Sequence, residues 1–167
     1  WEYPQVVQLT SMLPTLNATY LNYITNEAGD EGAKAFAAAL PTSKLTEIRL
    51  GFNLIGDEGA KALAAALPSS KLVSIFLDNN KISEDGAIEL AAALSSSKVA
   101  YFNLGHNYAG VKGAKAFAAA LPSSKLTKIV LSRNQIGDEG AKALAAALPS
   151  SKLIMIDLYR NLIGDQG

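Results

Sequence analysis

Apolar and polar residues recur along this chain with a period of 27 residues. The stretch from Ile55 to Lys71 (IGDEGAKALAAALPSSK) returns letter for letter from Ile136 to Lys152, and looser copies begin at Ala28, Ile82 and Ala109. One lysine marks the same position in each copy, at Lys44, Lys71, Lys98, Lys125 and Lys152. A repeat of this length is typical of a solenoid, in which each unit packs only on its neighbours.

A typical unit shows two periodicities in turn. Residues 48–50 alternate apolar and polar, as in a strand with one buried face, and residues 60–67 carry apolar side chains at helical spacing. Pro68 predicts the end of that helix, because the residue before a proline avoids the α region. Asp57 stands at the helix start, where we expect it to cap the helix that it begins. Each unit is therefore predicted to run strand, turn, helix and return.

These units divide the whole chain, 1–167, as a single domain. Residues 1–16 align with the helical half of a unit, and their bulky side chains, Trp1 included, suit an N-terminal cap. The alternative is that they belong to an ordinary repeat. Full units are predicted at 17–43, 44–70, 71–97, 98–124 and 125–151, and a shortened one at 152–167. Because this last unit stops before its helix, we expect either a longer protein or end-to-end self-association at the open end.

Two further positions hold one residue type throughout. We interpret the asparagines as structural, with each buried amide bonding the backbone of its own turn and of the next unit. The glycines are expected where a helix start packs closely against the adjacent unit. The asparagines are Asn26, Asn53, Asn80, Asn107, Asn134 and Asn161. The glycines are Gly32, Gly59, Gly86, Gly113, Gly140 and Gly167.

The segment LTEIRLGFNLIG (45–56) fits the LxxLxLxxNxL signature of leucine-rich repeats. With its long helical half, GDEGAKALAAALPSS, the chain resembles the ribonuclease-inhibitor-like subclass of that family. The resemblance implies an α/β fold, a right-handed horseshoe arc with parallel strands on the concave face and helices on the convex face. The dimensions of the elements lead to the same expectation. Strands lie ~4.8 Å apart and helices are ~10 Å wide, so the helical side must fan outward and the strand side becomes concave. Ala18, Tyr23 and Ala109 depart from the signature, so we expect repacked core layers there.

Composition narrows the classes of function. Fifteen basic and fifteen acidic residues cancel, whereas a protein held to nucleic acid or to a membrane by charge normally carries a basic excess. The chain has no cysteine, which excludes disulfides and thiolate metal sites. It favours a cytoplasmic location, and the alternative is a secreted bacterial effector, because the GAKALA core also resembles repeats in such proteins.

No catalytic constellation is found in the sequence. Phosphate-binding glycine loops and the GxSxG nucleophile motif are absent, and His106 is the single histidine. Acidic pairs such as Asp57 and Glu58 recur at helix starts in most units, whereas an active site is needed once. We therefore expect no enzymatic activity, no cofactor and no metal.

The variable residues lie beside the predicted strands, at positions that strand alternation directs into the concave face. All three arginines of the chain are among them, with five of its eleven tyrosines and phenylalanines. Arginine and tyrosine are enriched at interface hot spots, and exposed aromatic patches usually mark interaction surfaces. The predicted partner-binding residues are Tyr20, Asn22, Glu47, Arg49, Phe52, Phe76, Asp78, Tyr101, Asn103, His106, Lys128, Arg133, Met155, Asp157, Tyr159 and Arg160.

The sequence thus predicts a module that binds a protein or peptide through its concave face. The expected anchors are Arg49, Phe52, Phe76, Tyr101, Arg133, Tyr159 and Arg160. One alternative is a GTPase-activating protein resembling the Ran activator, for which the singular edge loop at 107–112 (NYAGVK) is the candidate region. Another is a passive scaffold or an engineered repeat array, which the two identical stretches would suit.

Overall fold

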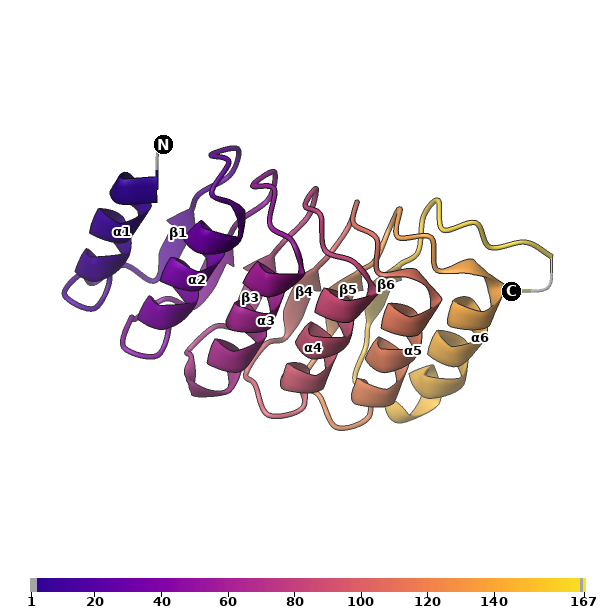
Figure 1. Ribbon diagram of the computed structural model, residues 1–167. Helices are drawn as coiled ribbons and strands as arrows, with labels where there is room; N and C mark the ends of the chain where they lie inside the picture. Colours follow the sequence, from indigo (N-terminus) through magenta and orange to yellow (C-terminus); the bar gives the residue numbers. More distant parts are fainter. Residues whose placement is uncertain (1–2, 166) are drawn as a thin grey trace.

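Helices and strands alternate along the whole chain (Figure 1). The computed structural model describes residues 3–165 and 167, so the covering role predicted for Trp1 lies outside the described residues. The helices are α1 (Tyr3–Met12), α2 (Gly29–Ala39), α3 (Asp57–Ala66), α4 (Glu84–Leu94), α5 (Gly110–Ala120) and α6 (Gly137–Ala147). The strands are β1 (Tyr20–Asn22), β2 (Glu47–Arg49), β3 (Ser74–Phe76), β4 (Tyr101–Asn103), β5 (Lys128–Val130) and β6 (Met155–Asp157). Short 3₁₀ turns follow α3 at Leu67–Ser69 and α6 at Leu148–Ser150, each containing the proline predicted to end the helix.

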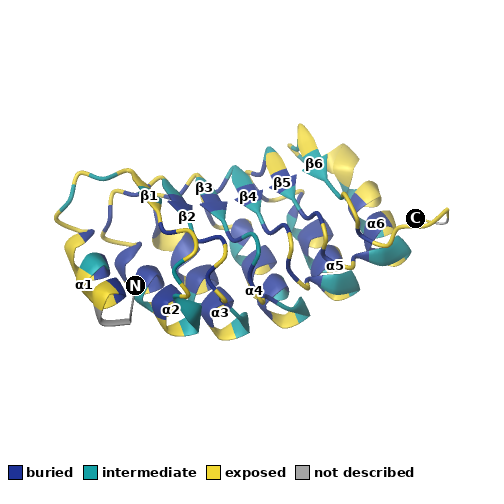
Figure 2. Ribbon diagram, turned by 90° about the horizontal axis from the view of Figure 1, so that it is seen from above, coloured by how far each residue is buried: buried dark blue, intermediate teal, exposed yellow. Residues whose placement is uncertain are grey.

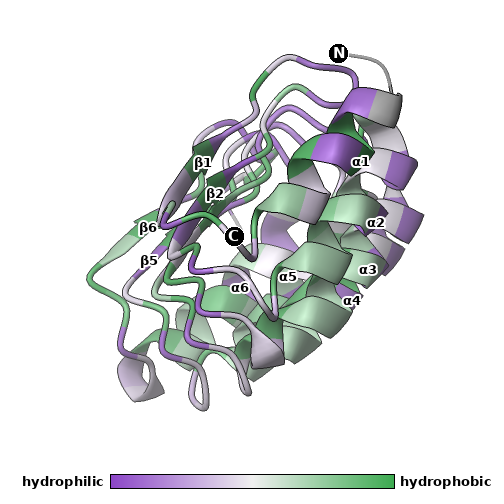
Figure 3. Ribbon diagram, turned by 90° about the vertical axis from the view of Figure 1, so that its left-hand side faces the viewer, coloured by the Kyte–Doolittle hydropathy of each residue, from purple (hydrophilic) through white to green (hydrophobic). Residues whose placement is uncertain are grey.

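The strands form one parallel sheet in chain order, β1 to β6. The register advances by the sequence period, so that Tyr20 pairs with Glu47 and Glu47 with Ser74. The helices form a second layer on one side of the sheet (Figure 3). Buried residues line the space between the layers (Figure 2). The predicted α/β leucine-rich-repeat solenoid, with strands on the concave face and helices on the convex face, is confirmed.

Core layers that depart from the repeat signature are repacked, as predicted at Tyr23 and Ala109. In the unit of Ala109, phenylalanine replaces the usual helix leucine, and the ring of Phe117 lies 5.5 Å from that of Phe102. In the unit of Tyr23, Phe36 plays the same part, with its ring edge-on to the tyrosine at 5.1 Å. Burial raises the pKa of the Tyr23 hydroxyl. The units with isoleucine in place of Ala109 carry leucine on the helix, at Leu63, Leu90 and Leu144.

From Asn53 onward, the recurrent asparagines join neighbouring units through their side-chain amides. Asn80 accepts hydrogen bonds from the backbone N–H groups of Asn53 and Ile55, at 3.1 and 2.9 Å. It donates to the carbonyls of Leu50 and Leu77, at 3.0 and 2.9 Å. The structural role is confirmed, but the expected direction was wrong: the amide bonds its own turn and the preceding unit. In each such turn, some backbone N–H groups find no acceptor within their own unit. The asparagine one period later accepts hydrogen bonds from them.

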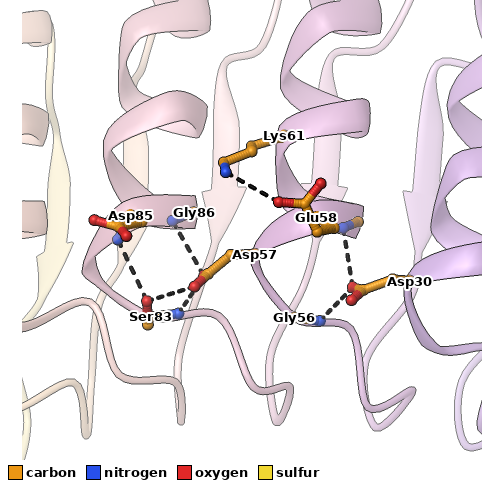
Figure 4. A network of polar contacts seen from close by, with 9 residues as sticks. Asp30, Gly56, Asp57, Glu58, Lys61, Ser83, Asp85 and Gly86 are labelled. Atoms are coloured by element: carbon orange, nitrogen blue, oxygen red, sulfur yellow. Dashed lines mark hydrogen bonds and ion pairs between the residues drawn. The ribbon is translucent and has the colours of Figure 1, made fainter.

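The aspartates at the helix starts also act on a neighbouring unit, not on their own helix (Figure 4). Asp57 accepts from the backbone N–H groups of Ser83 and Gly86, at 2.8 and 3.1 Å, and so caps α4. Asp30 likewise accepts from Gly56 and Gly59 at the start of α3. The prediction that Asp57 caps its own helix was wrong, because Asp57 is the first helical residue and Gly56 is the cap position.

This series of contacts is interrupted in two units before it resumes at Asp138, which accepts from the backbone N–H of Gly164 at 2.7 Å. Glu84 reaches the next unit through the backbone N–H and the ammonium of Lys112, which lower the pKa of its carboxyl. In the following unit Val111 holds the acidic position. Its side chain has no acceptor for the first N–H groups of α6.

Close packing between helix starts explains the recurrent glycine. A Cβ at Gly59 would lie 2.7 Å from the carboxylate of Asp30 and 2.8 Å from the Cβ of Ala33. At Gly86 it would meet Asp57 at 2.6 Å. The predicted close approach is confirmed, since a side chain here would displace the carboxylate that caps the helix.

A buried serine after each of the helices α2 to α5 was not anticipated from the sequence. Ser70 donates its hydroxyl to the Leu67 carbonyl at 2.9 Å and accepts from the Leu72 backbone at 3.3 Å. It thereby joins the helix end to the next strand. The equivalents are Ser43, Ser97 and Ser124, all buried.

Replacing Asn80 by alanine should lower the free energy of unfolding by about 3 kcal/mol or more, because several buried backbone groups lose their partners. Asn26→Ala is the control, since the Asn26 amide is half-exposed and donates to Ile24. We expect it to cost less than about 1 kcal/mol. Urea unfolding followed by circular dichroism measures both, and equal effects would contradict the inter-unit role of the buried amide.

The alanine–phenylalanine pairing predicts coupling between Ala109 and Phe117. Ala109→Ile alone should destabilise by about 1–3 kcal/mol through overpacking, and Phe117→Leu alone by about 1–2 kcal/mol through loss of buried volume. The double variant restores the isoleucine–leucine pair found in other units. Its loss of unfolding free energy should be smaller, by at least about 1 kcal/mol, than the sum of the losses in the two single variants. A double-mutant cycle in urea checks this, and simple additivity would refute the compensation.

Candidate partner-binding face

The first and third residues of each strand lie on the sheet face that the helices do not cover. None of the residues predicted to bind a partner is buried. The exposed ones are Tyr20, Asn22, Phe52, His106, Lys128, Arg133, Met155, Tyr159 and Arg160. The half-buried ones are Glu47, Arg49, Phe76, Asp78, Tyr101, Asn103 and Asp157. Their binding role stays a prediction.

Five of these side chains stack across five consecutive strands, and we call them the strand row: Tyr20, Arg49, Phe76, Tyr101 and Lys128. The Arg49 guanidinium carbon lies 4.7 Å from the Phe76 ring centre and 5.6 Å from that of Tyr20. Phe76 and Tyr101 meet edge-on at 4.9 Å, and the Lys128 ammonium lies 5.8 Å from the Tyr101 ring. The 27-residue register brings these residues together, because it places them on adjacent strands.

The guanidinium at the centre of this row is held from its own strand. Glu47 accepts a hydrogen bond from Arg49 Nε at 2.8 Å. This bond raises the pKa of Arg49. The half-buried guanidinium is thus fixed between two aromatic rings before any partner arrives.

Several predicted binding residues also organise the turn after their strand. Asn22, Asn103 and Asp157 each accept the backbone N–H of the residue two positions further on. Asn103 also donates to Asp78 at 3.1 Å. These amides and carboxylates therefore contribute to turn geometry as well as to the surface.

The second position after the strand differs from its expected place on the open face in three units, although the equivalent Tyr159 is exposed. Gly51, Gly105 and Ser132 are buried. A Cβ at Gly51 would lie 3.0 Å from the carboxylate of Asp78. At Gly51 and Gly105 the side chain of the neighbouring unit thus covers this position.

The next residue in each unit adopts a left-handed backbone at the edge of the sheet, and we call this set the edge row. Phe52 has φ 57°, His106 57°, Arg133 53° and Arg160 55°. Thr25 and Asn79 share the conformation. The sequence prediction thus combined two sets of residues, one over the strands and one at the turns beyond them.

A polar hollow of about 420 Å³ lies among the edge-row side chains. Phe52, His106 and Arg133 line it together with Tyr108 and Gln135, which sequence reasoning did not propose as binding residues. Both stand at a position that varies between units, and this variability was the available signal. Tyr108 belongs to the edge loop singled out at 107–112.

The last strand leaves its core layer partly open. Ile156 and Leu158 are half-exposed, whereas Ile129 and Leu131 in the preceding unit are buried. Nearby, the Arg160 guanidinium lies 5.2 Å from the Tyr159 ring. Self-association at this end stays a prediction.

The repeat geometry agrees with direct comparison to known families. The family described as "Leucine Rich repeat" matches residues 43–64 and 123–145. The chain has the leucine-rich-repeat fold. No curated protein matches its sequence, and its assignment to the ribonuclease-inhibitor-like subclass stays a prediction.

Solved structures include similar leucine-rich-repeat domains. The actin-binding site 2 of leiomodin-1 superposes with a TM-score of 0.74 at 17% identity, over 90% of this chain and 89% of that one. The tropomodulin C-terminal domain of Caenorhabditis elegans gives 0.70 at 14% identity, over 90% and 93%. At these identities the likeness is one of fold.

Two other kinds of site were sought in the described part of the chain. No helix there is both long and apolar enough to cross a membrane. Within the same residues, no group of three or more histidine, aspartate or glutamate side chains is placed to hold a metal ion.

The left-handed conformation of the edge row predicts an unusual response to mutation. Asparagine tolerates this backbone better than phenylalanine or arginine, and Asn79 already occupies the equivalent position. Phe52→Asn and Arg133→Asn should therefore keep or raise the free energy of unfolding, by up to about 1 kcal/mol. Urea unfolding tests this, and a loss above about 1 kcal/mol in either variant would show that the side chain stabilises the fold.

Proposed function

We propose that this leucine-rich-repeat protein binds a protein or peptide partner across its open strand face. The strand row forms the centre of the contact, and Phe52, Arg133, Tyr159 and Arg160 contribute anchors at its margin. The single observation that carries the proposal is the continuous stack of aromatic and cationic side chains over five strands.

The open face itself supports this function. Parallel sheets are normally covered on both sides, because their strands are rich in apolar residues. Here helices cover one side, and Tyr20 on the other side remains 48% exposed. Aromatic rings on an uncovered sheet are the kind of surface that partner proteins bury.

Preorganisation explains how such a surface would gain affinity. Arg49 is already fixed by Glu47 and by two rings, so docking would order few additional rotamers. Ordering a long side chain at an interface costs roughly 0.5–1.5 kcal/mol, and a prestacked row avoids much of this.

The dimensions of the face suit an extended segment. Six strands at ~4.8 Å spacing span roughly 24 Å. An extended chain advances ~3.3 Å per residue, so roughly seven residues would cover the sheet. Actin appears in the description of the leiomodin-1 domain. At 17% identity that partner is not transferred, and our proposal is limited to a protein or peptide.

Removing two aromatic side chains of the strand row should abolish tight binding. A partner is first isolated from the native source by pull-down with the wild-type chain. Phe76→Ala with Tyr101→Ala should then weaken its affinity, measured by calorimetry, at least tenfold, since truncating one hot spot costs about 2 kcal/mol or more.

Lys61→Ala is the matched control, because this exposed lysine lies on the helical side and pairs with Glu58 at 3.0 Å. It should leave the affinity unchanged. Circular dichroism confirms that each variant is folded. If the double variant binds as well as the wild type, the strand face is not the binding surface.

A further inference from the structure

The hollow beside the strand row is lined by donors and by aromatic walls. Its eight lining residues include no aspartate or glutamate. Asn80 and Asn107 direct their amides into the inter-unit ladder. The side chains left to face a ligand include those of Phe52, His106, Tyr108 and Arg133.

Arg133 is the cation in this hollow whose charge is not matched. Its guanidinium is exposed and makes no hydrogen bond or ion pair to any described residue. The carboxylate of Asp78 is already engaged by Asn79 and Asn103, at 3.2 and 3.1 Å. By contrast, Arg49 has Glu47 as its partner. A planar guanidinium free at the wall of a hollow is suited to bind a carboxylate through two parallel hydrogen bonds.

The backbone supports the same interpretation. Phe52 and Arg133 occupy left-handed positions that disfavour large side chains, while Asn79 shows that a residue better suited to this backbone fits the same place. Such strain is commonly kept where a side chain serves a function. His106 and Gln135, which line the same hollow, share this backbone conformation.

We propose that the hollow receives an acidic side chain of the partner, aspartate or glutamate. Its carboxylate accepts hydrogen bonds from the Arg133 guanidinium, and Phe52 and Tyr108 flank its aliphatic part. This inference rests on the proposed strand-face function and specifies it: the partner segment carries an acidic residue where it passes the edge of the sheet.

The test uses displayed peptides and needs no natural partner. A library of random twelve-residue peptides is selected on the wild-type chain, and binders are resynthesised with amidated C-termini, so that acidic side chains supply their carboxylates. Affinities are measured for each peptide and for its Glu→Gln or Asp→Asn counterpart. The proteins are the wild type, Arg133→Asn and the Phe76→Ala/Tyr101→Ala variant.

We expect an acidic position to be enriched among the binders. Arg133→Asn should weaken the acidic peptide at least tenfold and its amide counterpart less than twofold. Because Asn79 already tolerates the same backbone, this variant should remain folded, and its urea unfolding verifies that.

The affinities of the variants distinguish the ways in which the two proposals could fail. If binding is lost in the Phe76→Ala/Tyr101→Ala variant but not in Arg133→Asn, the hollow is refuted and the strand face stands. If selected peptides bind independently of both variants, both proposals are refuted. Equal losses for acidic and amide peptides in Arg133→Asn would also overturn the proposal, since the guanidinium would then not be recognising a carboxylate.

Discussion

The structure depends on hydrogen bonds that cross from one unit to the next. A turn such as that of Asn53 cannot satisfy its own backbone N–H groups, and the amide of Asn80 supplies the acceptor. Asp57 does the same for the start of α4. Unpaired backbone groups in a dry interior are costly. A unit is therefore complete when its neighbour is in place, and this dependence fixes the stacking distance and the parallel register.

Much of the fold could be predicted from the sequence because the period determines the register. Once Glu47 and Ser74 occupy the same place in successive units, pairing of their strands follows. The direction of the polar contacts could not be predicted in the same way. Asp57 lies one residue inside the helix, a boundary that periodicity does not resolve, and its true partner is 29 residues away at Gly86.

At the candidate site too, the sequence predicted the positions set by regular structure and not those set by a local turn. Strand alternation correctly placed Arg49 and Phe76 on the open face, since side chains of a strand alternate between faces. It failed after the strand ends, where the backbone turns left-handed at Phe52 and moves that side chain to the sheet edge. The hollow around Arg133 arises from this turn, so residues such as Tyr108 could be assigned to it only from the structure.

Because Val111 replaces an acidic residue, one junction between units lacks the carboxylate contact found at the junctions on either side. A carboxylate at Asp30, Asp57 or Glu84 binds the backbone of the next unit. The junction between α5 and α6 has valine at that place, and there the units are joined by packing, by Asn134 and by backbone hydrogen bonds such as that from Gly110 to Asn134. In a linear array of this kind, each unit is stabilised by its contacts with the units beside it. The end unit that carries Tyr159 and Arg160 is therefore joined to the aromatic stack without a carboxylate at this helix start, and the Lys115 ammonium and the Glu139 carboxylate, 3.8 Å apart, link α5 to α6 instead.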